Sequence, residues 1–304
     1  MKLSIIIVHF NTPGLLEQCL NSLIEKRLPG DWEVIVVDNA STIFNFSAKG
    51  GSRFAGQFSI FKQCANVQII QNKENLGFSK ANNIGIQKSS GEYVLLLNPD
   101  TVVSQQAIRR VIDYTDQHTD GGVATCRVEL SGGELDDACH RGFPTPWNAF
   151  CHFSGIASLF PHSTIFNGYH LGYQNMHKIH EIDACAGAFM LIRRSAGEEV
   201  NWLDEEYFWY GEDIDICYRL KQKAWKVLYI PDVKIVHYKG MASGIKKQTA
   251  GISKADEFTK AGAQKARFDA MRIFYRKHYL HQYPRGITFI VDKGIALLGW
   301  IHKV

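Results

Sequence analysis

Acidic side chains stand at the ends of two apolar runs in this sequence. The run Tyr93 to Leu97 stops at Asn98-Pro99-Asp100, and the run Glu33 to Val37 stops at Asp38-Asn39. Uninterrupted Val, Ile and Leu residues are typical of a strand that is buried on both faces, as strands of parallel sheets are. Ligands of open α/β sheets bind beyond the carboxyl ends of such strands, so these carboxylates are candidates for contact with a ligand. Asn-Pro-Asp is also a common turn sequence, which is the structural alternative.

A second group of acidic residues follows a cluster of aromatic residues. The segment Tyr207-Phe208-Trp209-Tyr210-Gly211 is followed by Glu212-Asp213-Ile214-Asp215. The carboxylates could simply occupy the first turn of a helix, where the helix dipole favours negative charge. Alternatively, the aromatic rings could form a wall on which a sugar stacks, and they would raise the pKa of a neighbouring carboxyl group by excluding water.

The elements expected before these residues form a βαβ unit. Leu3 to Val8 is suited to a buried strand. Thr12 can cap a helix that has Pro13 in its first position and runs to about Lys26, and the next strand is Glu33 to Val37. No Gly-x-Gly-x-x-Gly sequence lies between the first strand and the helix, so a dinucleotide site of the Rossmann type is not expected.

A third strand and a second helix bring amide side chains to the same edge. Val67 to Ile70 predicts the strand, and Ser79 is expected to cap a helix that carries Asn82 in its first turns. The amino end of a helix favours anions. With Phe10-Asn11 after the first strand, these elements place carboxylates and amides along one edge of one sheet.

Four of these segments, in this order, resemble the successive motifs of a family 2 glycosyltransferase with the GT-A fold. They are Ile5 to Asn11, Val36 to Ser41, Asn75 to Asn82 and Leu96 to Asp100. The Asn-Pro-Asp form most resembles bacterial rhamnosyltransferase-like members. The resemblance implies an α/β fold with a mostly parallel central sheet flanked by helices, in which a Rossmann-like nucleotide-binding half is joined to an acceptor-binding half.

The resemblance also implies roles on the donor side. Asp38 would hydrogen-bond the base or ribose of a nucleoside-diphosphate-sugar, and Asp100 would bind a divalent cation, Mg²⁺ or Mn²⁺, that bridges the diphosphate. The alternatives are a turn aspartate and, for the amides, helix capping. The predicted donor-binding residues are Phe10, Asn11, Asp38, Asn39, Asn75, Phe78, Asn82, Asn98 and Asp100.

The metal site departs from the commoner Asp-X-Asp pattern of the family. Asn98 replaces the first carboxylate, which leaves the cation more dependent on the diphosphate and on another protein ligand. His237 follows the acidic helix at a strand end and resembles the metal-binding His of the family. A lone His is often structural, but Asp100 and His237 are the predicted metal ligands.

On the catalytic side, Gly-Glu-Asp-X-Asp with Arg219 is similar to the acidic motif of the family. The resemblance assigns the general base to Asp213 and a supporting role to Glu212, and it pairs Arg219 with an acidic neighbour. Asp183 begins a segment that would pass beneath the reacting sugar, although it could equally be an ordinary surface residue. The predicted acceptor-side and supporting residues are Asp183, Trp209, Asp215 and Arg219.

Further elements are expected in the second half. The regular elements are a helix over Ser104 to Gln117, a strand over Gly122 to Cys126, two short strands (Lys226 to Ile230 and Val233 to His237) around the Pro231-Asp232 turn, and a helix over Ala255 to Tyr279. An irregular segment over Ser131 to His177 is a candidate acceptor-binding wall. A basic loop over Met241 to Ser253 could close on the diphosphate.

Composition limits the function classes. The chain has 304 residues, 45% hydrophobic content and a formal net charge of +4, with Lys and Arg scattered along it. This fits an anionic small molecule better than nucleic acid. Seven cysteines without a CxxC pair indicate neither a zinc site nor a disulfide framework, and they suit a reduced, cytoplasmic protein. The first residues do not resemble a secretory signal.

The C-terminal segment leaves two expectations open. Ile287 to Ile301 is strongly apolar, but Asp292 and Lys293 interrupt it and it is short for a membrane span. It could pack on the core or lie in a membrane interface, which would make the protein peripheral at the inner face of the cell membrane.

The sequence therefore predicts three regions and one leading function. Residues 1–126 would bind the nucleotide-sugar, 127–253 would bind the acceptor and carry the catalytic acids, and 254–304 would form a helical extension. The function would be metal-assisted, inverting transfer of a sugar, with rhamnose favoured by the resemblance, from a dTDP- or UDP-sugar to a glycan or lipid-linked acceptor. The alternatives are a non-catalytic sugar-nucleotide-binding subunit and a nucleotidyltransferase. The oligomeric state is not predicted.

Overall fold

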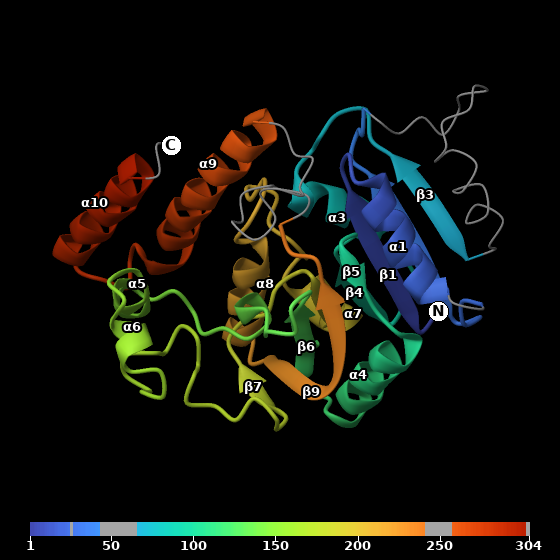
Figure 1. The fold of residues 1–304 in the computed structure, drawn as a ribbon, viewed down its shortest axis with the longest axis horizontal. Coiled ribbons are helices and arrows are strands. Elements are labelled where there is room, and N and C mark those ends of the chain that lie inside the picture. Colours follow the sequence, from blue (N-terminus) through green and yellow to red (C-terminus); the bar gives the residue numbers. More distant parts are fainter. Residues whose placement is uncertain (25–26, 43–65, 241–256, 302–304) are drawn as a thin grey trace.

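A nine-stranded sheet forms the centre of the molecule (Figure 1). The computed structural model describes residues 1–24, 27–42, 66–240 and 257–301. The strand order of the sheet is β3-β2-β1-β4-β8-β6-β9-β5, with β7 paired to β9. The predicted basic loop over residues 241–253 lies outside the described residues.

The first half of the chain supplies the parallel part of the sheet. Its elements are β1 (Leu3–His9), α1 (Pro13–Ile24), β2 (Trp32–Asp38), β3 (Val67–Gln71), α3 (Phe78–Gln87) and β4 (Tyr93–Leu97). β3, β2, β1 and β4 are neighbours in this order and run parallel. Every residue of β1 and β4 is buried, as expected for strands covered on both faces. The predicted βαβ unit and both later strands are confirmed.

The second half extends the same sheet. Its elements are β5 (Thr101–Val102), α4 (Gln105–Gln117), β6 (Gly121–Leu130), η1 (Asp137–Cys139), α5 (Pro146–Phe153), α6 (Ile156–Leu159), β7 (His180–Ile182), β8 (Phe189–Arg193), α7 (Arg194–Glu199), α8 (Glu212–Gln222), β9 (Lys226–His237), α9 (Glu257–Phe274), η2 (Tyr275–Tyr279) and α10 (Arg285–Ile301). Strands β6 and β9 run in the direction of the first-half strands, whereas β5, β7 and β8 run against it. The sheet is therefore mostly parallel, as predicted.

Helices cover the sheet and also form one end of the molecule. Helix α3 packs on β1 and β2, α4 on β6 and β9, and α8 on β9. The hydroxyl of Ser104 caps α4 by accepting a hydrogen bond from the backbone N–H of Ala107, so the helix predicted there is confirmed. Helices α9 and α10 pack against each other beyond α8 (Figure 1).

The two helix caps predicted for the first half are wrong. The hydroxyls of Thr12 and Ser79 are buried without a hydrogen-bond partner among the described residues. Helix α3 instead begins after Gly77, whose φ is +81°. A Cβ at Gly77 would lie 2.6 Å from the carbonyl oxygen of Phe208, so the close approach of the two segments requires a glycine there.

The two short strands predicted around Pro231-Asp232 are one strand, β9. Cys126 of β6 pairs with Ile230, and the next residue, Arg127, pairs with Lys234. The intervening residues of β9 form a bulge, which absorbs the extra length and tolerates a proline that has no N–H to donate. The bulge keeps β9 paired with β6 as far as His237.

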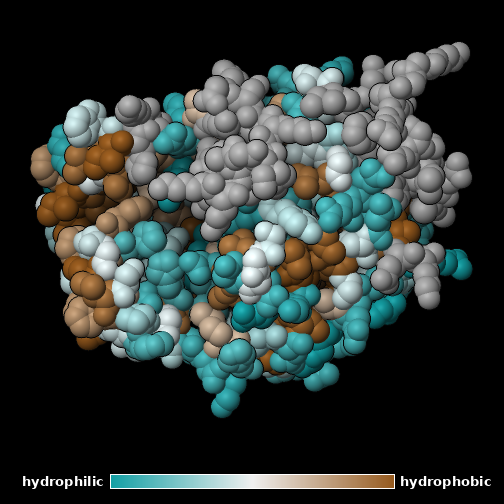
Figure 2. All heavy atoms as spheres, in the orientation of Figure 1, coloured by the Kyte–Doolittle hydropathy of each residue, from teal (hydrophilic) through white to brown (hydrophobic). Residues whose placement is uncertain are grey.

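Helix α10 packs on α9 and leaves one side apolar and exposed. Its large hydrophobic residues with exposed side chains are Phe289, Ile290, Leu297, Trp300 and Ile301. Figure 2 shows the hydrophobic surface at the end of the molecule where α10, α5 and α6 lie. Within the described residues, no helix combines the length and the apolar character that crossing a bilayer would require.

Candidate donor and catalytic site

Strand pairing brings Asp100 and His237 together at the edge of the sheet. Strand β4 ends at Leu97, and two residues of β5 then pair antiparallel with β9, so that Thr101 lies opposite His237. The backbone N–H of Tyr238 donates to the carbonyl oxygen of Asp100 at 2.8 Å. Nε2 of His237 consequently lies 3.2 Å from Oδ1 of Asp100, and both side chains are almost fully buried.

A third acid, Asp136, holds the other nitrogen of the same imidazole. Nδ1 of His237 lies 2.8 Å from Oδ2 of Asp136, and Lys239 pairs with Oδ1. Asp136 was not among the predicted site residues. Its only signal in the sequence was its place in the irregular segment from Ser131 to His177, because η1 and the end of β9 meet only in the fold.

The charges of this cluster shift the pKa values of its members. Burial alone would lower the pKa of His237, but the carboxylates of Asp100 and Asp136 outweigh it and raise the pKa to about 9. Burial alone would raise the pKa of Asp136, but the hydrogen bond from His237 and the charge of Lys239 hold it well below its usual range. The charged side chains of Asp100, His237, Asp136 and Lys239 therefore stabilise one another electrostatically.

Asp100 and His237 fit the predicted cation through one carboxylate oxygen and one imidazole nitrogen. Among the described residues, no group of three or more His, Cys, Asp or Glu side chains is arranged to hold a metal ion. Asp136 does not count as a third ligand, because it contacts the imidazole on the far side. The remaining ligands of a cation would have to be oxygens of the diphosphate and water.

Asp38 lies at the end of β2, beside the end of β1. Its Oδ1 accepts a hydrogen bond from the backbone N–H of Ser41 at 3.0 Å and lies 3.3 Å from Nε2 of the buried His9. Asn11 and Ala40 have φ values of +54° and +64°, so both strand ends turn sharply. Oδ1 of Asn11 accepts from the backbone N–H of Thr42 at 2.8 Å, which ties the two turns together.

The side chain of Asn39 holds the loop that leads into α3. Its amide nitrogen donates to Oδ1 of Asn75 at 2.8 Å and to the carbonyl oxygen of Gly77 at 3.2 Å. Its amide oxygen accepts from the side chain of Asn72 and the backbone N–H of Leu76. Both the nitrogen and the oxygen of the amide are thus hydrogen-bonded, so Asn39 holds the predicted donor loop in its conformation.

Phe78 and Asn82 lie at the start of α3, where they meet two other segments. The backbone N–H of Phe78 donates to the carbonyl oxygen of Phe208 at 2.7 Å. The ring of Phe78 packs over Gly187. Asn82 is buried, and its amide nitrogen donates to the carbonyl oxygen of Phe78 at 2.9 Å. The predicted donor loop thus contacts the aromatic segment that precedes α8.

The segment from Asp183 to Ala188 connects the two predicted halves of the site. The carbonyl oxygen of Ala188 accepts a hydrogen bond from the backbone N–H of Asn98 at 3.2 Å. At the other end of the segment, Ala184 forms an isolated β-bridge with Arg141. This six-residue segment therefore contacts the end of β4 at one end and Arg141, which pairs with Asp213, near the other.

Asp213 forms an ion pair with Arg141. Nη2 of Arg141 donates to Oδ2 of Asp213 at 2.6 Å, and both side chains are mostly buried. The nearby carboxylate raises the pKa of Arg141 although burial opposes this, so the guanidinium stays charged. Arg141 was missed from the sequence because 72 residues separate it from Asp213.

Glu212, next to Asp213, is buried and lacks a counter-charge of its own. Its Oε2 has no hydrogen-bond partner among the described residues. Burial, reinforced by the charge of Asp213, raises the pKa of Glu212 to about 8. Glu212 therefore stays largely protonated near neutral pH.

Asp215 is a fully buried anchor. Its Oδ2 accepts from Nε of Arg219 at 2.7 Å, which is the pairing predicted for Arg219. Its Oδ1 accepts from the hydroxyl of Tyr207 at 3.3 Å and lies 2.7 Å from Nε2 of His278. Asp215 thereby connects α8 to the C-terminal helical region.

Asp183 and Trp209 lie at the periphery of these groups. Asp183 is partly exposed and accepts hydrogen bonds from Nζ of Lys221 at 2.9 Å and from the backbone N–H of Phe143 at 3.2 Å. Trp209 stacks on Tyr210 with ring centroids 5.5 Å apart and planes 11° apart. The stacked pair is a flat aromatic surface directly before α8.

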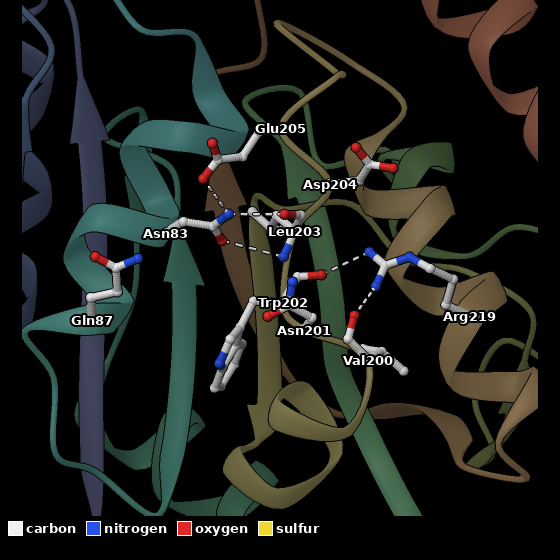
Figure 3. A pocket seen from close by; sticks show the side chains of 9 residues that line it. All are labelled: Asn83, Gln87, Val200, Asn201, Trp202, Leu203, Asp204, Glu205 and Arg219. Atoms are coloured by element: carbon white, nitrogen blue, oxygen red, sulfur yellow. Dashed lines mark hydrogen bonds between the residues drawn. The ribbon is translucent and has the colours of Figure 1, made fainter.

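A separate polar cavity of about 370 Å³ lies between α3 and the segment 200–205 (Figure 3). Asn83 spans it by donating to the carbonyl oxygen of Leu203 and to Glu205. Arg219 donates to the carbonyl oxygen of Trp202 at 2.7 Å. Of the predicted site residues, the cavity wall contains Arg219 alone, so this cavity is distinct from the Asp100 and Asp213 groups.

A comparison of the sequence with models of known protein families finds one family. The family model described as glycosyl transferase family 2 matches residues 4–200. Rhamnosyltransferase WbbL of Escherichia coli K12 is 29% identical over 170 residues, which cover 53% of this chain and 61% of that protein. The N-acetylglucosaminyl-diphospho-decaprenol L-rhamnosyltransferase of Mycobacterium tuberculosis is 24% identical, over 80% of this chain and 78% of its own length.

Solved structures show the same fold at low identity. GalNAc-T7, solved with UDP, GalNAc and Mn²⁺, superposes with a TM-score of 0.57 at 17% identity, over 92% of this chain and 58% of that chain. This likeness confirms the predicted GT-A fold. The chain spans less than two thirds of the length of WbbL.

Proposed function

The chain belongs to glycosyl transferase family 2, and we propose that it transfers a sugar from a nucleoside-diphosphate-sugar to a hydroxyl group of a glycan or lipid-linked acceptor. One observation carries the proposal. Asp100 and His237 face each other at 3.2 Å at the edge of the sheet, and the segment 183–188 connects that edge to the Asp213–Arg141 ion pair. A site for a donor diphosphate would thereby lie near a carboxylate able to accept a proton.

On the donor side, we assign recognition of the base or ribose to Asp38 and the turn that contains Phe10 and Asn11. Asp38 is fixed by the backbone of Ser41, which supports this role. Phe78 and Asn82 would line the donor pocket, with Asn39 and Asn75 holding the loop before them. Residues 1–126 would thus form the donor half of the domain.

Asp100 and His237 would hold the divalent cation, Mg²⁺ or Mn²⁺. When bound, such a cation neutralises the charge that develops on the leaving diphosphate. Asn98, which stands where the commoner pattern has a carboxylate, would leave these two residues as the protein ligands. The hydrogen bond between its backbone N–H and Ala188 supports a role in shaping the edge.

On the acceptor side, Asp213 would act as the general base. The acceptor oxygen would attack the anomeric carbon from the face opposite the diphosphate, the bond from that carbon to the diphosphate oxygen would break, and Asp213 would take the hydroxyl proton. This direct displacement inverts the anomeric configuration. Glu212 supports the base, Trp209 supplies a stacking surface for a sugar, and Asp183 and Arg219 help to hold the surrounding segments.

The names of the relatives support a proposal for the donor sugar and the acceptor class. Two of them are named as rhamnosyltransferases, so dTDP-rhamnose is the donor we favour, with UDP-sugars as the comparison. The name of the mycobacterial relative specifies a polyprenyl-linked acceptor, which supports a lipid-linked glycan as the acceptor class. Cell-envelope polysaccharide synthesis at the cytoplasmic face of the membrane would be its setting.

A thermal-stability screen tests the donor assignment. The protein is heated with each nucleotide-sugar, with and without Mn²⁺ or Mg²⁺. A ligand that binds the native state alone raises the melting temperature according to its concentration and affinity. We expect the largest rise with a dTDP- or UDP-sugar in the presence of the cation. A rise with nucleoside triphosphates alone would instead favour a nucleotidyltransferase.

A further inference from the structure

The imidazole of His237 is held from both sides by carboxylates. Nε2 faces Asp100 at 3.2 Å, and Nδ1 lies 2.8 Å from Oδ2 of Asp136. An ionised carboxylate can only accept a hydrogen bond, so Nδ1 must carry the proton of that contact. The nitrogen left to bind a cation, once it gives up its own proton, is therefore Nε2, the atom that faces Asp100.

Asp136 is itself fixed. It is 1% exposed. Its Oδ1 accepts from the backbone N–H of Ala138 at 3.0 Å and from Nζ of Lys239. These two contacts hold the carboxylate in place, with Oδ2 facing Nδ1 of His237 at 2.8 Å. The carboxylate can thus determine the plane and the tautomer of the imidazole.

We propose that Asp136 is a positioning residue for the metal site, which holds His237 so that Nε2 points at a cation bound by Asp100. The inference rests on the proposed function, because it presumes that Asp100 and His237 are the metal ligands. Metal-binding His residues commonly donate their second nitrogen to a carboxylate, and loss of that partner typically weakens metal binding about 10- to 100-fold. The chain lacks the first carboxylate of the Asp-X-Asp pattern, so a correctly oriented His237 matters more here.

A double-mutant cycle on Mn²⁺ binding tests the inference. Free Mn²⁺ is measured by electron paramagnetic resonance in the presence of saturating UDP, for the wild type, Asp136→Asn, His237→Gln and the double variant. We expect Asp136→Asn to weaken binding about 10- to 100-fold in the wild-type background. In the His237→Gln background it should change the affinity by less than about twofold, because the residue it acts through is gone.

Asp137→Asn is the matched control, since it removes an equal charge from the adjacent, exposed residue. It should bind Mn²⁺ as the wild type does. If Asp136→Asn unfolds, as circular dichroism would reveal, Asp136→Ser takes its place in the cycle. Equal losses in both backgrounds, or unchanged affinity in the single variant, would overturn the positioning role.

The same measurement separates this inference from the proposed function. A wild type that binds Mn²⁺ with UDP while Asp136→Asn does so equally well overturns the inference and leaves the metal ligands in place. A wild type that binds no Mn²⁺ under these conditions removes the metal from the proposed function and the inference with it. Sugar transfer is then judged separately, by release of nucleoside diphosphate without added cation.

Discussion

Asp213 and Arg141 form a contact that bears directly on the proposed base. The guanidinium of Arg141 donates a charge-assisted hydrogen bond to the carboxylate of Asp213 at 2.6 Å. Arg141 is also rigidly placed, because its backbone forms a β-bridge with Ala184. The ion pair would therefore orient the proposed base before an acceptor binds.

Replacement of the Asp213 carboxylate should sharply lower turnover and leave donor binding unchanged. We expect Asp213→Asn to lower kcat about 10²- to 10⁴-fold, which is the usual contribution of a general base. The affinity for the nucleotide-sugar, measured by calorimetry, should change little. Glu198→Gln, which alters an exposed acid on α7, is the control. Near-normal turnover by Asp213→Asn would remove Asp213 from the base role.

Glu212 should make the stability of the protein depend on pH. Its pKa is raised from 4.5 to about 8 in the folded state, so between these pH values the native protein holds a proton that the unfolded chain has lost. Stability should therefore fall as pH rises through this window, by at most about 1.4 kcal/mol per pH unit.

Urea denaturation at several pH values checks this expectation. Gln does not titrate, so the free energy of unfolding of Glu212→Gln should depend less steeply on pH than that of the wild type. The stability of the variant relative to the wild type should rise with pH and level off above about pH 8. Glu198→Gln should keep the wild-type slope, because its carboxyl group is exposed. Identical slopes for Glu212→Gln and the wild type would mean that Glu212 is ionised in the folded protein.

At the residue scale, the sequence singled out candidate site residues but not the side chains that contact them. Asp100, His237 and Asp213 follow recognisable local patterns at a strand end or a helix start. Asp136 and Arg141 have no local pattern, because their partners lie far away in the sequence. Asp136 is 101 residues from His237, and Arg141 is 72 residues from Asp213. Contacts of that kind depend on how the irregular segment after β6 folds back, which periodicity does not describe.

At the scale of elements, helix α8 depends on the C-terminal helices. Asp215 is fully buried in α8 and accepts hydrogen bonds from Arg219 and Tyr207, and His278 of η2 contacts it at 2.7 Å. Lys277 adds a salt bridge to Asp204 in the segment before α8. Both His278 and Lys277 belong to the π-helical turn η2.

Removal of this contact should loosen α8. We expect His278→Ala to lower the free energy of unfolding by about 1–3 kcal/mol, because the buried Asp215 loses one hydrogen-bond partner. Chemical denaturation measures the change. His281→Ala is the matched control, since His281 lies one turn further along and is exposed. Equal stability of the two variants would show that η2 does not support the catalytic helix.

Most strands could be predicted because their apolar runs are long and end at polar residues. The bulge in β9 could not, since Pro231-Asp232 is equally typical of a turn and pairing with β6 decides between the two. The cap of α3 was misplaced for a related reason. Gly77 is required by the approach of Phe208, a tertiary contact that no local capping preference contains.

At the scale of the whole molecule, apolar side chains gather at one end (Figure 2). This apolar end consists of exposed residues of α10 together with those of α5, α6 and the residue that follows α6, namely Phe289, Ile290, Leu297, Trp300, Ile301, Trp147, Phe150, Phe153, Leu159 and Phe160. Exposed aromatic rings and Lys293, whose Nζ lies over the ring of Phe289, suit a membrane interface, where aromatic and basic residues both bind. We propose that this end contacts the membrane that holds a lipid-linked acceptor.

Liposome sedimentation tests the membrane contact. The protein should bind vesicles that contain anionic phospholipid more strongly than neutral ones, because the apolar area and the basic residues act together. Replacing Leu297 and Trp300 by Ser should weaken that binding by about tenfold or more, since both side chains are mostly exposed and each would bury apolar area. Unchanged binding by the double variant would place the contact elsewhere.

The sequence left the position of the C-terminal segment open between core and membrane. In the structure, α10 packs on α9 with one side and exposes large hydrophobic residues on the other, and the membrane expectation stays a prediction. Hydrophobicity alone could not separate the two, since an apolar face looks the same whether protein or lipid covers it. The pairing of α10 with α9 had to come from the fold.

The release of nucleoside diphosphate from a nucleotide-sugar, with and without EDTA, tests the central claim most directly. The account predicts that the protein releases nucleoside diphosphate from a dTDP- or UDP-sugar in the presence of an acceptor, that EDTA stops the release, and that Mn²⁺ or Mg²⁺ restores it. Release of pyrophosphate from a nucleoside triphosphate, or binding of the nucleotide-sugar without any turnover across the acceptor panel, would contradict it.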